Sequence, residues 1–183
     1  MKQIKNLQIG LIILAFLITA GGLFGGQFLT NKFRVEKPLH QELQRIKAIR
    51  NFQVKAEKDG VSVTLKLRKV DNLQQVVENI QQKVFLYYNQ PIKMLKINDN
   101  RNHYLEGLRY QLSFYLQEAA VSGHYIQLKT ALESYSGVKT KVYFGQDNMY
   151  LQLEKGANYL YEVVPFVTQT GTRINNPSGG DTV

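Results

Sequence analysis

The chain has 183 residues, of which 44% are hydrophobic and 20% are charged, as in an ordinary folded protein. It contains no cysteine, which excludes disulfide scaffolds, thiolate zinc sites and cysteine nucleophiles. The formal net charge is +9, and the excess lies in the first half: residues 1–101 hold 17 Lys and Arg against 7 Asp and Glu, whereas residues 102–183 hold 6 against 7. Such a basic surface attracts anionic lipid headgroups or nucleic acid.

The first predicted element is a membrane segment. Residues 7–29 form an uncharged run of 23 residues, and about 20 apolar residues suffice for a helix to cross a bilayer. A cleavable signal peptide is the alternative, because Ala20 and Gly22 are small residues placed as at a cleavage site. The apolar run continues through Phe28 and Leu29, so we prefer an uncleaved, single-pass transmembrane anchor over residues 1–30.

Two glycine pairs lie near the end of this run. Gly21 and Gly25 are four residues apart, as are Gly22 and Gly26, and each pair forms a GxxxG motif. Such motifs let two membrane helices approach closely. We therefore expect these four glycines to form a helix-packing face, with a homo-oligomer or another envelope protein as partner. Glycine is also simply common in membrane helices, and this explanation stays open.

The sequence also predicts a connector, a membrane orientation and a tail. Residues 31–37 are expected to be a polar connector. A short N-terminal tail before a single span commonly stays inside, so we expect the soluble domain to be extracytoplasmic at the cell membrane. The basic residues that follow the run argue for the opposite orientation. Residues 168–183 are polar and lack an apolar period, which predicts a disordered tail.

The α+β domain is expected over residues 38–167. Pro38 suits the first turn of a helix, and Leu39, Leu43, Ile46 and Ile49 continue it for about three turns. Residues 52–67 alternate around Asp-Gly, the signature of a hairpin.

This hairpin carries a group of basic residues. On the strand pattern, the residues predicted to form a basic surface are Lys55, Lys66, Arg68 and Lys69. Their predicted partner is the anionic headgroup layer of the membrane.

The remaining elements complete an α+β fold. Asp71 or Asn72 is placed to cap a helix that ends before Pro91, and residues 92–97 form a third strand. Residues 38–99 thus form an αββαβ unit. A long helix over 101–135, broken at Ser122 and Gly123, leads to a three-stranded antiparallel meander over 140–144, 149–154 and 159–166. This helix and meander make up residues 100–167.

No catalytic motif is recognisable. His40, His103 and His124 lack the spacing of metal ligands, and nucleophile-elbow, zinc-protease, Walker A and dinucleotide-binding motifs are absent. We therefore expect no metal, no cofactor and no enzymatic activity. The tyrosines of the meander indicate ordinary strand packing, with base stacking as the alternative.

The stretch DGVSVTLKLRKVDNLQQVVENI lies at the centre of the αββαβ unit. In its order of elements, the unit resembles the BON domains and ring-building motifs of bacterial envelope proteins. It departs from BON domains in having Leu67, Arg68 and Lys69 where they usually carry a glycine. The resemblance implies a scaffold that binds lipid or self-associates, and it implies no catalysis.

These expectations combine into a non-enzymatic, single-pass membrane protein that serves as a scaffold or interaction module at the bacterial envelope, with the lipid bilayer as its first partner. One alternative is an enzyme or enzyme accessory with an unrecognised site in residues 101–167. The other is a basic, membrane-proximal module that binds nucleic acid, which the lack of Lys and Arg clusters on the meander disfavours.

Overall fold

A computed structural model describes Phe16, Thr19 and residues 32–166. The chain divides into two compact units, Met1–Glu42 and Leu43–Val183. Within the described residues, one π-helical turn, η1 (Lys32–Glu36), continues directly into helix α2 (Lys37–Gln44). The residues of the predicted connector are therefore helical from Lys32 onward.

The helix predicted to extend to Ile49 is shorter than expected. It ends at Gln44, and Ile49 instead begins strand β1 (Ile49–Glu57), where it pairs with Leu67. The Arg68 N–H also donates to the Ala48 carbonyl at 2.7 Å. Ile46 and Ile49 fit a helical period, but this pairing with residues nearly 20 positions later overrides the local pattern.

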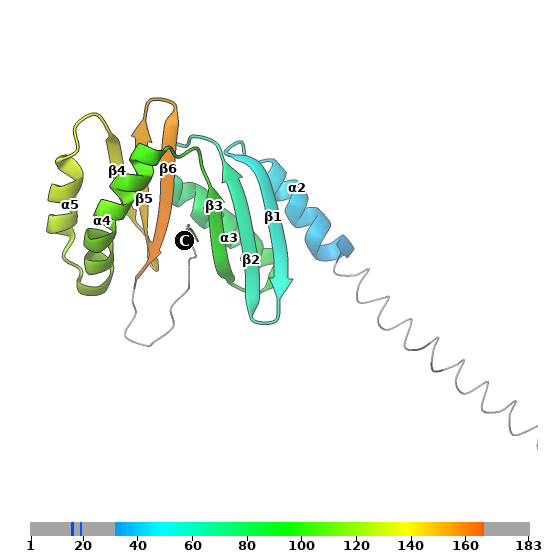
Figure 1. The fold of residues 1–183 in the computed structure, drawn as a ribbon. Coiled ribbons are helices and arrows are strands. Elements are labelled where there is room, and N and C mark those ends of the chain that lie inside the picture. The colour runs from blue at the N-terminus through cyan, green and yellow to red at the C-terminus, as the bar shows by residue number, and fades with distance from the viewer. Residues whose placement is uncertain (1–15, 17–18, 20–31, 167–183) are drawn as a thin grey trace, which may run out of the picture. The chain divides into compact units, whose positions relative to one another are not determined.

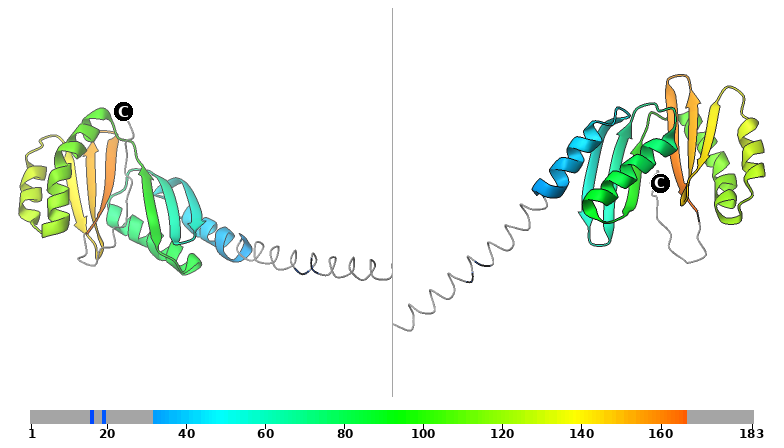
Figure 2. Two further views of the ribbon diagram at one scale, coloured as in Figure 1. Left: turned by 60° about the horizontal axis from the view of Figure 1, so that its bottom comes forward. Right: turned by 180° about the vertical axis from the view of Figure 1, so that it is seen from behind.

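The first sheet contains β1, β2 (Gly60–Leu67) and β3 (Ile92–Asn98), in the order β1-β2-β3. β1 and β2 are antiparallel, whereas β2 and β3 are parallel and are joined through helix α3 (Leu73–Tyr88) (Figure 1). Figure 2 shows α3 lying across one face of this sheet. The buried residues of β2 alternate along the strand, and they are Val61, Val63, Leu65 and Leu67. This alternation confirms the predicted strand.

Helix α3 has caps at both ends. The side-chain oxygen of Asn72 accepts a hydrogen bond from the Gln75 N–H at 3.1 Å, which confirms the predicted N-cap. Asn89 adopts a left-handed conformation with φ of 51°, and its N–H donates to the Phe85 carbonyl. Pro91 then separates the helix from β3.

The second half of the domain packs two helices on a meander. Helix α4 (His103–Ser122) and helix α5 (Tyr125–Glu133) are separated at Gly123, whose φ of 74° ends α4 as predicted. Strands β4 (Lys139–Phe144), β5 (Asn148–Lys155) and β6 (Asn158–Pro165) form the second sheet, antiparallel and in chain order.

The two helices cover one face of this sheet (Figure 2). The core between them is contributed by Leu105, Leu108, Leu112 and Leu116 of α4, Leu128 and Leu132 of α5, and Met149, Leu151, Leu153, Leu160 and Val164 of the sheet. The predicted α+β class is therefore confirmed for the described residues, with two three-stranded sheets.

Candidate functional site

The opposite face of the second sheet is polar and aromatic, and it contacts the loop between β2 and α3. The Tyr159 hydroxyl donates to the Leu67 carbonyl at 3.0 Å, and the Tyr143 hydroxyl donates to the Asp71 carbonyl at 3.0 Å. The Tyr161 hydroxyl accepts a hydrogen bond of 2.7 Å from the Val70 N–H. The tyrosines that the sequence analysis assigned to strand packing thus join the two sheets through their hydroxyl groups.

Gln152 lies at the centre of this contact and is completely buried. Its side-chain amide donates to the Val70 carbonyl at 2.6 Å and to the Glu154 carboxylate at 2.8 Å, while its oxygen accepts from the Leu73 N–H at 3.2 Å. A buried amide with these bonds is satisfied. Gln152 is therefore part of the joint between the sheets and not a group held ready for a ligand.

The buried carboxylates of the domain are paired with cations. Asp99 binds Arg101 at 2.8 Å, and Glu162 binds Arg109 at 2.8 Å. Burial raises the pKa of Glu154, but hydrogen bonds from Lys69 and Gln152 and the charge of Lys69 outweigh it, so the net pKa is lowered. The two buried carboxylates of residues 101–167, Glu154 and Glu162, therefore each have a cationic partner.

No metal-binding cluster is found in the described part of the chain, where no three His, Asp or Glu side chains gather closely enough. His40 lies on α2, His103 begins α4, and His124 precedes α5. The Nδ1 atom of His124 lies 3.8 Å from Glu118, and both side chains are exposed. The histidines thus lie on separate elements.

The predicted basic surface divides into two parts. Arg68 donates through Nη1 to the Lys47 carbonyl at 2.7 Å, and Lys69 lies 2.9 Å from the Glu154 carboxylate. Both residues therefore hold parts of the domain together. Lys55 and Lys66 instead lie exposed on the face of the first sheet opposite its buried residues.

A third lysine joins this face from β3. Lys96 pairs with Thr64, and Lys66 pairs with Asn98, so the two lysines are neighbours on adjacent strands, two positions out of register. Lys55 lies opposite Ser62, whose hydroxyl donates to Glu57. We call Lys55, Lys66 and Lys96 the lysine face. None of the three forms an ion pair within 4.0 Å with another described residue.

Sequence analysis missed Lys96, because its side of β3 depends on a register shift between Val61 and Ser62 in the β2–β3 pairing. Figure 1 shows the first sheet from the face that α3 does not cover. The lysine face is thus a solvent-exposed, cationic sheet surface, which can bind phosphate groups electrostatically.

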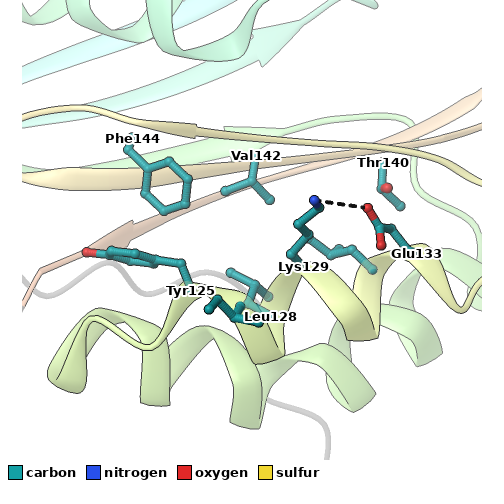
Figure 3. Close-up of a pocket in the computed structure, with 9 residues that line it drawn as sticks. Tyr125, Leu128, Lys129, Glu133, Thr140, Val142 and Phe144 are labelled. Atoms are coloured by element: carbon teal, nitrogen blue, oxygen red, sulfur yellow. Dashed lines mark ion pairs between the residues drawn. The ribbon is translucent and has the colours of Figure 1, made fainter.

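Two grooves lie elsewhere in the domain. One has a volume of about 460 Å³, lies between α5 and β4, and is mostly apolar (Figure 3). The other has a volume of about 390 Å³ and is lined by polar residues of α3 and of the β4–β5 turn. Tyr150 borders the second groove, and burial together with the charge of Glu78 raises its pKa to about 12.

The predicted membrane helix and its glycines, Gly21, Gly22, Gly25 and Gly26, lie outside the described residues, as does the tail. Among the helices that are described, none has the length and apolar character needed to span a bilayer. Comparison of the chain with protein-family models, with curated proteins and with solved structures finds no match.

Proposed function

We propose that the protein is a non-enzymatic, membrane-anchored interaction module of the bacterial envelope, and that its lysine face lies against anionic phospholipid headgroups. The observation that carries this proposal is a set of three lysines on one sheet face, none of which has a carboxylate partner among the described residues. Sheet faces that are solvated on one side normally carry polar residues, but three unpaired cations with a single nearby carboxylate, Glu57, make this face electropositive.

The size of the electrostatic attraction fits a tethered domain. Each lysine near an anionic membrane surface contributes about 1 kcal/mol, so three contribute about 3 kcal/mol, which is roughly a hundredfold in an equilibrium constant. That is too weak to recruit a free protein firmly, but it is enough to orient a domain that an anchor already holds at the bilayer. The predicted anchor over residues 1–30 supplies this condition.

The absence of cysteine allows a clean test. A single cysteine at Gln53, which is exposed and pairs with Thr64 on the lysine face, receives an environment-sensitive fluorophore in the full-length chain. In nanodiscs containing about one third phosphatidylglycerol, we expect its emission to shift to the blue relative to pure phosphatidylcholine discs. The shift should shrink as salt rises, because exposed charges are screened beyond about 10 Å at 0.1 M.

Two controls make the test specific. The same label at Gln117, exposed on α4, should not respond to lipid charge. Replacing the three lysines of the face by glutamine should abolish the shift at position 53, whereas replacing the exposed Lys47, Lys58 and Lys129 changes the net charge equally and should preserve it. Equal responses at positions 53 and 117, or a shift that survives loss of the lysine face, would contradict the proposal.

A further inference from the structure

The two edges of the second sheet differ. At β6, the N–H groups that point outward are already bonded: Tyr159 donates to the Asn100 carbonyl at 3.2 Å, and Tyr161 donates to the Asp99 carboxylate at 2.8 Å. The segment that joins β3 to α4 therefore covers this edge at Tyr159 and Tyr161. A covered edge cannot accept another strand.

At β4, the opposite edge is open. Tyr161 of β6 points its N–H away from β5, so its partner Gln152 points its own N–H and C=O groups away from β6 and toward β4. On β4, Gln152 pairs with Lys141. The alternation of an antiparallel ladder then turns the N–H and C=O groups of Thr140 and Val142 outward. No hydrogen bond from these outward groups to another described residue is found.

The open edge borders the apolar groove. Thr140, Val142 and Phe144 direct their side chains to the α5 side of β4 and line the groove together with residues of α5 (Figure 3). The rings of Tyr125 and Phe144 meet at one end, with centroids 4.6 Å apart, while Lys129 and Glu133 lie toward the other. Unpaired strand groups beside an apolar groove are the arrangement used when a sheet accepts an extended peptide as an additional strand.

The groove also has an unusual apolar residue. Ile126 of α5 lines it and is 81% exposed, the highest exposure among the large hydrophobic side chains of the described residues. Leu128, by contrast, is buried beneath. A strand added to β4 would direct every second side chain into the groove toward Ile126 and Val142, and apolar side chains fit these positions.

The other face of the added strand would meet cations. Lys139 and Lys141 alternate with the groove residues and lie on the opposite side of β4. Lys139 is exposed and has no ion pair within 4.0 Å in the described part of the chain, and Lys141 bonds only the backbone carbonyl of Asp71, at 2.8 Å. Opposite charges across neighbouring strands are stabilising, and like charges are destabilising.

We propose that the edge of β4 and the α5 groove bind an extended segment of a partner protein in which apolar and acidic side chains alternate. The apolar side chains enter the groove, the acidic ones face Lys139 and Lys141, and the segment bonds the outward groups of Thr140 and Val142. This site is separate from the lysine face and does not depend on it.

A second copy of this chain does not fit as the occupant. Pairing of two β4 edges would place Lys139 and Lys141 of one copy on the same face as those of the other, and the cations would repel. The chain's own tail does not fit either, because residues 168–183 contain a single acidic residue, Asp181, and no apolar–acidic alternation.

The test uses the full-length chain in phosphatidylcholine nanodiscs and a fluorescent peptide of sequence EVEIEVE, followed by fluorescence anisotropy. We expect saturable binding, and hydrogen exchange should slow at the Thr140 and Val142 amides. The peptide KVKIKVK should bind at least tenfold more weakly, because its lysines face Lys139 and Lys141. A peptide with the same composition in blocks, EEEEVIV, should also bind more weakly, because it cannot alternate.

Two variants locate the site. Ile126→Glu places a carboxylate in the groove at an exposed position, so the fold should tolerate it while peptide affinity falls about tenfold. Thr140→Pro removes an outward N–H without breaking a ladder bond and should weaken binding similarly. The matched control, Val121→Glu, alters an apolar residue of α4 that is 65% exposed and lies outside the groove, and it should bind as wild type does.

The outcomes are decisive. Binding that Ile126→Glu leaves unchanged, equal affinity for the acidic and basic peptides, protection of amides elsewhere, or no binding of EVEIEVE at all would each overturn the proposal. Loss of the lysine face should leave peptide binding unchanged, so failure here is distinguishable from failure of the lipid-facing role.

Discussion

Tyr161 and Val70 are 91 positions apart in the chain, and the Tyr161 hydroxyl accepts a hydrogen bond of 2.7 Å from the Val70 N–H. Both residues are buried. The bond therefore fixes the loop that follows β2 to the polar face of the second sheet, and burial raises the pKa of the Tyr161 hydroxyl above its ordinary range.

Tyr161→Phe should destabilise the domain. The substitution keeps the ring but leaves the buried Val70 N–H without its partner, which costs about 1–3 kcal/mol. The loss is measured as a lower urea midpoint for the full-length chain. Tyr110→Phe is the control, because Tyr110 is 69% exposed on α4 and its change should stay within about 0.5 kcal/mol. Equal midpoints for wild type and Tyr161→Phe would show that the bond is not needed.

The Lys69–Glu154 pair should make stability depend on pH. The folded-state pKa of Glu154 lies below its ordinary value of 4.5, so the contribution of the pair to stability is fully present above pH 4.5 and is lost as pH falls through the folded-state pKa. In Lys69→Met, burial of Glu154 continues to raise its pKa while the cation is gone. The acid-side loss of stability should therefore begin at higher pH.

This shift is measured by urea unfolding between about pH 3 and pH 7. Lys66→Met removes an exposed lysine of the lysine face and should follow the wild-type profile. Identical acid profiles for Lys69→Met and wild type would contradict the role of the pair.

Gly60→Ala should be destabilising. Gly60 has φ of 147°, and an added Cβ would lie 2.9 Å from the Lys93 Cβ and 3.1 Å from the Pro91 carbonyl oxygen. Backbone strain of this kind costs about 1–3 kcal/mol. Gly107→Ala provides the contrast, because an added Cβ within α4 meets nothing within 4 Å and should stabilise the helix by roughly 0.5–1 kcal/mol. The two thermal midpoints should move in opposite directions, and a shared direction would refute the argument.

The anchor hypothesis predicts that the full-length protein stays in membranes after a carbonate wash. The apolar run of 23 residues is long enough to span the bilayer. N-terminal sequencing checks the alternative, because a mature chain beginning at Leu23 would establish cleavage of a signal peptide.

The glycine hypothesis predicts that Gly22→Ile together with Gly26→Ile lowers dimerisation of the segment 1–36 in a bilayer reporter. Branched side chains would hold the two backbones apart, and membrane helices have little hydrophobic force to compensate for lost packing. Insertion should be unchanged, because the apolar length is kept. Equal dimerisation at equal insertion would show that the glycines are only tolerated.

Local sequence patterns predicted most of the helices and strands. The errors occur where contacts between residues far apart in the chain determine the structure. Asp59 and Gly60 were expected to form the hairpin turn, but Gly60 pairs with Glu57, so Lys58 and Asp59 form it. Gly60 itself begins β2, with a positive φ. The neighbouring Pro91 carbonyl, which accepts from the Val61 N–H at 3.0 Å, lies directly before β3, so a pattern in residues 52–67 does not reveal it.

The same limit applies to the basic surface. Lys66 and Lys69 are three residues apart and have the same chemistry, yet one is exposed on the lysine face and the other binds Glu154. The strand alternation predicts the side of Lys66. Lys69 lies after the end of β2, and its side chain is oriented by Glu154 of the second sheet, which begins 70 positions later in the chain.

The side chains of the second sheet bind the loop between β2 and α3 through main-chain groups of that loop. Tyr159, Tyr161, Tyr143 and Gln152 bond to carbonyl or amide groups of Leu67, Val70, Asp71 and Leu73. Every amino acid except proline offers these same groups. In evolution, the loop side chains at Arg68 and Asp71 can therefore change without separating the sheets, whereas the three tyrosines and the glutamine cannot. Apart from Lys69, whose side chain binds Glu154, sequence drift is therefore allowed on the loop side of the joint, which leaves the loop free to acquire new surface chemistry on an unchanged scaffold.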